Sequence, residues 1–150
     1  PMLETSGMII GFYEREFYVF SNFSSFGVDW KGKYWQTSEH AYQAAHFFNS
    51  CPRLAEQIHK SRSAHEAYKI AKSNSHLAPK NWHDIKVTIM HDICKHKLDQ
   101  NEYIKHKLKD TGNLLIVEDS PFDSFWGWGG DRRGQNELGK IWMKLRDKLG

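Results

Sequence analysis

The segment 81–98, NWHDIKVTIMHDICKHKL, constrains the fold more than any other part of the sequence. Asn81 is suited to cap a helix, and apolar side chains then recur at helical spacing. One stripe holds Trp82, Ile85, Ile89 and Ile93, with Met90, Cys94 and Leu98 beside it. The sequence therefore predicts a long amphipathic helix here, with one face in the core.

Capping residues indicate further helices on both sides of this segment. Thr37 or Ser38 is suited to cap the helix that follows it. Pro52 can open a second helix as its first residue, and Ser63-x-x-Glu66 is a capping-box pattern that opens a third. Two later helices are expected, one over residues 102–109 and a C-terminal one whose core face holds Leu138, Ile141, Trp142, Leu145 and Leu149.

Strands are predicted mainly in the first third of the chain. Residues 8–23 favour a strand and then an irregular segment, and FGVDWKGKYW (26–35) has the form of a hairpin with Lys31 and Gly32 at its turn. LLIVE (114–118) is a later, brief strand. Because 150 residues are the size of one typical domain, we expect a single α+β domain over residues 1–150. It should be predominantly helical, with a small sheet near the N-terminus.

Composition narrows the class of protein. The chain has 21 basic and 18 acidic residues, and a net charge of +3 permits phosphate contacts but is far below that of a nucleic-acid coating protein. The first residues lack the basic and apolar regions of a signal peptide, and no stretch approaches the roughly 18 apolar residues of a membrane span. We therefore expect a cytoplasmic protein with no membrane partner.

The cysteines and histidines indicate neither a disulfide framework nor a metal site. Cys51 and Cys94 are far apart, without a zinc-binding pattern, and we interpret both as structural. The nine histidines show no HExxH spacing, so we interpret them as scattered surface residues. We expect no metal and no cofactor.

A glycine-rich segment, GWGGDRRG (127–134), precedes the C-terminal helix. The adjoining GQNELGKI (134–141) has the letters of a phosphate loop, but Ile141 stands where Ser or Thr is required, and its second half is helical in pattern. A weaker hypothesis remains. Flexible backbone with Arg132 and Arg133, leading into a helix N-terminus, is a workable cradle for a diphosphate, and a solvated turn is the alternative.

Glu39 and Asp123 are the best pair of carboxylates for acid–base chemistry. Each is expected at the boundary of an element and beside aromatic residues, which can desolvate a carboxyl group and keep it protonated. Against this, a first-turn glutamate such as Glu39 is common because it complements the helix dipole. The residues alone leave both interpretations open.

Several stretches, in order, resemble one family. FYVFSNF (17–23), KYWQTSEHAYQAAHF (33–47) and SPFDSFWGWGGDRRGQNELGKIWMKLRD (120–147) are similar to the NADAR proteins, also known as the YbiA-like group. The helix over 81–98 fits the family's Trp-x-x-x-Lys-x-x-x-Met pattern. The resemblance covers almost the whole chain and implies a mainly helical fold with a small β part.

The resemblance also implies an activity and a set of site residues. The family's members are N-glycosidases. Some cleave phosphoribosyl-aminopyrimidine intermediates of riboflavin synthesis, and others remove ADP-ribose from guanine bases of DNA or RNA. The matching pocket residues would be Asn22, Trp35, Glu39, Lys86, Asp123, Trp126 and Gly127, followed by Gly134, Asn136 and Gly139 of the glycine-rich run. The chain departs at His46, where the family usually has lysine, which puts a phosphate contact there in doubt.

Both substrates join ribose C1 to an exocyclic amino nitrogen, so the furanose ring can open to an imine. A lysine amine could attack that imine and form a Schiff base. Lys33 is the first candidate for this nucleophile and Lys86 the second, while direct attack by water through an oxocarbenium-like state is an equal competitor. We expect a monomeric hydrolase that acts on ADP-ribosylated guanine and releases ADP-ribose. The alternatives are the riboflavin-type glycosidase and a silent module that binds NAD or ADP-ribose.

Overall fold

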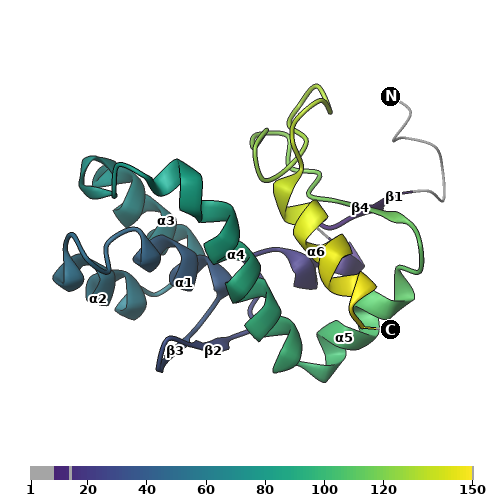
Figure 1. The fold of residues 1–150 in the computed structure, drawn as a ribbon, viewed down its shortest axis with the longest axis horizontal. Coiled ribbons are helices and arrows are strands. Elements are labelled where there is room, and N and C mark those ends of the chain that lie inside the picture. Colours follow the sequence, from purple (N-terminus) through teal and green to yellow (C-terminus); the bar gives the residue numbers. More distant parts are fainter. Residues whose placement is uncertain (1–8, 14, 150) are drawn as a thin grey trace. The chain divides into compact units, whose positions relative to one another are not determined.

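The computed structural model describes residues 9–13 and 15–149 (Figure 1). Helices make up most of it, which confirms the predicted α+β class with predominant helix. In chain order the elements are β1 (Ile9–Gly11), the 3-10 helix η2 (Arg15–Phe20), β2 (Val28–Trp30), β3 (Lys33–Trp35), α1 (Ser38–Ala45), α2 (Pro52–Lys60), α3 (Ala64–Ser73), the 3-10 helix η3 (Ser75–Leu77), α4 (Trp82–Asp99), α5 (Glu102–Asp110), β4 (Leu115–Val117) and α6 (Glu137–Asp147).

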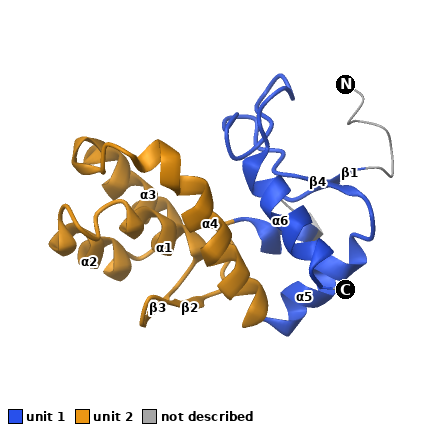
Figure 2. Cartoon of the chain, in the orientation of Figure 1, with its two compact units in different colours: residues 1–21, 101–150 blue, residues 22–100 orange. Residues whose placement is uncertain are grey.

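The chain forms two compact units, coloured separately in Figure 2. One combines the N-terminal residues 1–21 with the C-terminal residues 101–150, and the other consists of residues 22–100. We call them the terminal unit and the central unit. The expectation of one domain over residues 1–150 stays a prediction.

Helix α1 is the centre of the central unit. Every residue from Ser38 to Ala45 is buried, and the helix packs against α2, α3 and α4. Its neighbour α4 is the long helix that the sequence predicts, but its most buried face differs from the predicted stripe. Of that stripe only Ile93 is buried, whereas the residues expected beside it, Met90, Cys94 and Leu98, are buried together with Lys97.

The predicted hairpin is confirmed in the central unit. Strands β2 and β3 pair antiparallel, and Lys31 and Gly32 at the turn have φ values of 53° and 78°. Both residues are thus left-handed, as in the two-residue turns that match the twist of a hairpin. The Gln100 side chain holds the hairpin at the end of α4, since its Oε1 accepts from Asp29 N at 2.7 Å and its Nε2 donates to Asp29 O at 2.8 Å.

The terminal unit brings together the first and the last strand of the described chain. β1 pairs in parallel with β4, with Ile10 opposite Ile116, and not with the hairpin. The small β part near the N-terminus is confirmed, but β1 does not join the hairpin, because its partner lies about a hundred residues later. Helix α6 packs on β4 and buries Leu138, Ile141, Trp142 and Leu145 of its predicted face, whereas Leu149 lies beyond the end of the helix and is half-buried. Trp142 donates from Nε1 to Phe20 O at 3.0 Å.

Candidate active site

Glu39 lies in the first turn of α1, where the sequence places it. Of the two predicted caps, Thr37 is the N-cap, and its Oγ1 accepts from His40 N at 3.1 Å. Glu39 N donates instead to Asn22 O at 3.0 Å. These bonds fix the start of the helix against the segment that precedes the hairpin, so the position of the Glu39 backbone is set from two sides.

His40 contradicts the interpretation of the histidines as surface residues. It is fully buried, with Nδ1 2.8 Å from Thr37 Oγ1 and Nε2 3.1 Å from Ser61 O. Burial lowers the pKa of His40, so at neutral pH the uncharged ring donates from Nε2 to the Ser61 carbonyl and accepts at Nδ1 from the Thr37 hydroxyl. The ring joins the start of α1 to the residue that follows α2.

The Glu39 side chain is buried as well, at 5% exposure. Its Oε2 accepts a hydrogen bond of 2.7 Å from Nε2 of Gln43, one turn further along α1, and Gln43 is itself 7% exposed. A glutamate that served only the helix dipole would gain its small stabilisation at the surface, without the desolvation that a buried carboxylate suffers. The geometry therefore favours a functional interpretation of Glu39.

Two residues next to Glu39 each have a buried side-chain atom without a hydrogen-bond partner in the described chain. Asn22 accepts from the Glu39 backbone, and Ser38 precedes Glu39 in the sequence. Asn22 is 7% exposed; its Nδ2 lies 3.2 Å from Met90 Sδ, and its Oδ1 has no partner there. Ser38 is fully buried, and its Oγ also lacks one among the described residues. Buried polar atoms are rarely left in this state, and each such case indicates a ligand or a water.

Lys33 lies at a different place in the central unit. Its Nζ is 2.6 Å from Oε1 of Glu56, whose pKa is lowered chiefly by this hydrogen bond. The two residues line a cavity of about 300 Å³ together with Lys31, Trp35, Phe48, Pro52 and Ala55. The structure thus brings Lys33 and Trp35 together, and Glu39 is not among the lining residues of this cavity.

Lys86, the second candidate lysine, is half-buried on α4. Its charge acts on His46, the position where the resemblance implies a lysine. Burial, and to a smaller extent the charge of Lys86, lower the pKa of His46 to about 4, and the ring lies 3.9 Å from that of Trp82. An uncharged, packed imidazole does not replace a lysine as a phosphate contact.

Lys97 is a buried lysine that sequence reasoning missed. It is fully buried on α4, its Nζ is 3.1 Å from Ser24 Oγ, and burial lowers its pKa to about 8. Helical spacing could have indicated its burial, because Lys97 lies four residues after Ile93 and three after Cys94, on the same face of the helix. Cys94 itself is structural as predicted, since burial raises the pKa of its thiol to about 12.

Asp123 belongs to the terminal unit, and its carboxylate caps a turn. Oδ1 accepts from Phe125 N at 2.9 Å and from Trp126 N at 2.7 Å. Such bonds order the backbone of the segment that carries Trp126 and Gly127. This arrangement favours the structural role of Asp123 over the acid–base role.

The glycine-rich segment folds back on itself ahead of α6. Five successive backbone N–H groups, from Gly134 to Leu138, donate to carbonyls of residues 124–128 at 2.8–3.1 Å. Because these include the first N–H groups of α6, the helix N-terminus is not an open site for a diphosphate. The predicted cradle therefore needs a correction: if this segment binds phosphate, side chains must supply the charge.

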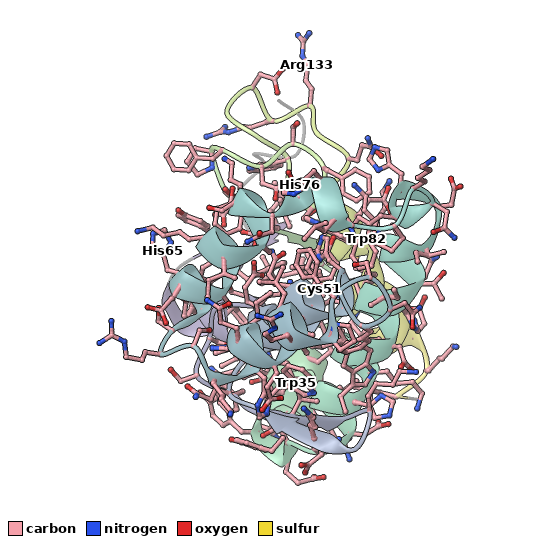
Figure 3. All side chains as sticks on the ribbon, turned by 90° about the vertical axis from the view of Figure 1, so that its left-hand side faces the viewer. Trp35, Cys51, His65, His76, Trp82 and Arg133 are labelled. Atoms are coloured by element: carbon pink, nitrogen blue, oxygen red, sulfur yellow. The ribbon has the colours of Figure 1, made fainter. Side chains whose placement is uncertain are left out.

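Asn136 and the two arginines occupy distinct places in this segment. Asn136 has a φ of 52° and links the segment to the end of β4, accepting from Glu118 N at 2.9 Å and donating to Ile116 O at 3.0 Å. The Arg132 guanidinium lies over the Trp128 ring at 5.5 Å. Arg133 is exposed and extends away from the loop, as Figure 3 shows. The structure also agrees with the rejection of a phosphate loop at residues 134–141, because Glu137 already begins α6.

Two properties of the described residues concern metal binding and membrane insertion. They hold no group of three or more His, Cys, Asp or Glu side chains arranged to bind a metal ion. No helix in the described part of the chain has the length and apolar character needed to cross a membrane.

Comparisons with known proteins agree on one family. The model of the NADAR domain matches residues 11–150. An N-glycosidase of Nostoc punctiforme is 35% identical over 145 residues, covering 95% of this chain and 93% of that protein. The N-glycosidase YbiA of Escherichia coli K12 is 33% identical over 143 residues, covering 94% and 88%.

A longer relative and a solved structure complete the comparison. A riboflavin biosynthesis protein of Vibrio vulnificus is 36% identical over 129 residues, but the chain spans only 35% of that protein's length. The NMR structure of Escherichia coli YbiA superposes with a TM-score of 0.85 at 32% identity, covering 95% of this chain and 84% of that one. The similarity to the proteins of matching length thus extends over both units.

Proposed function

Because the chain belongs to the NADAR domain family, we propose that it is an N-glycosidase that removes ADP-ribose from guanine bases of DNA or RNA. Relatives of its own length are named N-glycosidases, which supports the reaction class. The bond cleaved joins ribose C1 to the exocyclic amino nitrogen of the base. No metal or other cofactor takes part in the proposed reaction.

One observation carries the assignment of the acting carboxylate to Glu39. This side chain is buried in a protein unit whose neighbouring groups, Asn22 Oδ1 and Ser38 Oγ, lack partners among the described residues. A chain selected only for stability would avoid a buried carboxylate, and buried polar atoms without partners in the same unit add to that cost. Glu39 is therefore better explained by a chemical task than by a contribution to stability.

The contacts of Glu39 indicate its role. The hydrogen bond from Gln43 and the position in the first turn of α1 both favour the ionised form, whereas burial opposes it. An ionised Glu39 can stabilise the positive charge that develops at C1 and can accept a proton from the attacking nucleophile. Asp123, whose Oδ1 accepts two backbone bonds, holds the turn before Trp126 in this proposal.

Two routes to the product follow. In the first, the furanose C1–O bond breaks as the ring oxygen gains a proton, and the amine of Lys33 adds to the resulting imine carbon. The base then leaves with the electron pair of its C1–N bond and a proton, and water releases ADP-ribose from the lysine Schiff base. In the second, water attacks C1 directly. Lys33 lines a cavity of about 300 Å³ with room for a ligand, which supports the first route, but Glu39 does not line that cavity. Lys86 is the alternative amine.

Each unit carries basic side chains that could contact the phosphates of a polymer, which supports a polymeric substrate over a free nucleotide. Arg133 is exposed in the terminal unit, and Lys31 and Lys33 border the cavity of the central unit. With a net charge of +3, contacts to a nucleic-acid strand should be weak and sensitive to salt.

A second candidate substrate is the phosphoribosyl-aminopyrimidine of riboflavin synthesis. It is favoured by the relatives that are named riboflavin biosynthesis proteins. A third possibility is a silent module that binds ADP-ribose.

The deciding experiment compares hydrolysis of an ADP-ribosylated guanine oligonucleotide and of the aminopyrimidine substrate, with wild type and Glu39→Gln. We expect the oligonucleotide to have the higher kcat/KM and Glu39→Gln to lower turnover at least about a hundredfold. A higher kcat/KM for the pyrimidine would transfer the assignment to the second candidate. Affinity for the oligonucleotide without release of ADP-ribose would identify the silent module.

A further inference from the structure

Gln43 and Glu39 form a buried pair on one face of α1. They are four residues apart, so their side chains lie one turn from each other on the same face. The distance between Gln43 Nε2 and Glu39 Oε2 is 2.7 Å, and the two residues are 7% and 5% exposed. Such a bond to a carboxylate in a buried place is short and strong compared with one at the surface.

We propose that Gln43 is a positioning residue for Glu39, which fixes the carboxylate in one orientation and favours its ionised form. The inference rests on the proposed function, because Gln43 has this task only if Glu39 acts on the substrate. Gln43 itself is not assigned any contact with the substrate.

The surroundings of Glu39 give the amide of Gln43 this role. His40, the next residue, is engaged with Thr37 and Ser61. Asn22 directs its Nδ2 toward the sulfur of Met90. Gln43 is a nearby side chain that the structure shows donating to the carboxylate. Because every residue of α1 is buried, the rotamers of both partners are also restricted by packing.

A purely structural role is the competing explanation. A buried carboxylate needs a donor, and Gln43 could do no more than offset the loss of hydration. The two explanations differ in coupling. A positioning residue affects turnover only through Glu39, whereas a structural residue affects the fold whether or not residue 39 carries a charge.

The test is a double-mutant cycle with Glu39→Gln, Gln43→Leu and the double variant, assayed on the ADP-ribosylated guanine oligonucleotide. We expect Gln43→Leu to lower kcat about 10- to 100-fold, the effect of losing one hydrogen bond to a charged group, with KM changed less than about threefold. In the Glu39→Gln background the same substitution should change kcat by less than about twofold.

Two further variants keep the test decisive. Gln43→Met retains the length of the side chain without a donor, and it carries the same prediction if Gln43→Leu does not fold. Gln100→Leu is the matched control, because it removes two hydrogen bonds between the hairpin and α4 in the same unit. It should lower the melting temperature and leave kcat within about twofold of wild type.

An equal loss of kcat from Gln43→Leu in both backgrounds would overturn the inference in favour of a structural role. Wild-type turnover of a folded Gln43→Leu or Gln43→Met would overturn the inference too. If Glu39→Gln is inactive in the same experiment, the proposed function still stands. Full activity of Glu39→Gln is a different result, because it would remove the proposed function itself.

Discussion

Replacing Asp123 separates a structural carboxylate from a catalytic one. Its Oδ1 accepts two backbone hydrogen bonds, of 2.9 and 2.7 Å, and the residue is half-buried. An alanine at this position removes both bonds. An asparagine keeps an oxygen in the same place, so both bonds can still form, although the acceptor is no longer charged.

The expected magnitudes follow from these two bonds. With about 1–1.5 kcal/mol for each partly exposed bond, Asp123→Ala should lower the free energy of unfolding by about 2–3 kcal/mol. For a chain of this size that corresponds to a fall in melting temperature of about 4–12 °C. Asp123→Asn should lose about 1 kcal/mol or less.

The assay combines thermal unfolding with steady-state kinetics on the oligonucleotide substrate. Asp131→Ala is the control, because Asp131 Oδ1 accepts one exposed bond, from Arg133 N at 3.0 Å, in the same segment. We expect a smaller effect on stability from this variant than from Asp123→Ala. An Asp123→Asn protein with unchanged melting temperature and turnover reduced a hundredfold or more would refute the capping role and return Asp123 to the chemistry.

Three other predictions concern the lysines and the product. If an imine forms, borohydride added during turnover should leave a covalent ADP-ribose adduct that mass spectrometry detects, and Lys33→Ala should abolish this adduct. An adduct on Lys86, or no adduct on the wild-type protein, would contradict the assignment to Lys33. Burial lowers the pKa of Lys97 to about 8 from an unfolded value of 10.5. Between about pH 8 and pH 10.5 the unfolded chain therefore keeps a proton on Lys97 that the folded chain has lost, so the free energy of unfolding should rise with pH through this window. Urea unfolding should show a smaller rise for Lys97→Met, and equal slopes for the two proteins would contradict a depressed pKa. Free ADP-ribose should inhibit competitively, and a short oligonucleotide should be hydrolysed as well as a long one; strong dependence on length would mean that the strand itself is recognised.

The sequence predicted those parts of the fold that local chemistry determines. The hairpin turn at Lys31 and Gly32, the cap at Thr37 and the first residue of α2 at Pro52 each depend on residues within a few positions. Parallel pairing of β1 with β4 depends on residues about a hundred positions apart, and nothing in either short strand specifies its partner.

The candidate site divides in the same way. Glu39 could be placed in the first turn of α1 because helix capping is a local signal. Its burial, the donor supplied by Gln43 and the buried ring of His40 depend on three other helices packing around α1, and a helix pattern alone does not reveal that every face of α1 is covered. Lys97 is the opposite case, since its spacing from Ile93 already placed a charged residue on the buried face.

The glycines of the C-terminal segment acquire a different meaning once its hydrogen bonds are known. A side chain at Gly127 would place its Cβ 2.5 Å from Glu118 O, and one at Gly134 would place it 2.6 Å from Ser124 O. Both contacts are far too short, so these positions require glycine for the close approach of backbone to backbone within the protein. Since the N–H groups of residues 134–138 are occupied by the same segment, the glycine pattern does not by itself indicate a phosphate-binding loop. The pattern instead shapes a segment that orients Trp126 and Asn136 and carries Arg132 and Arg133, whose guanidinium groups are its side-chain candidates for contacts to a diphosphate.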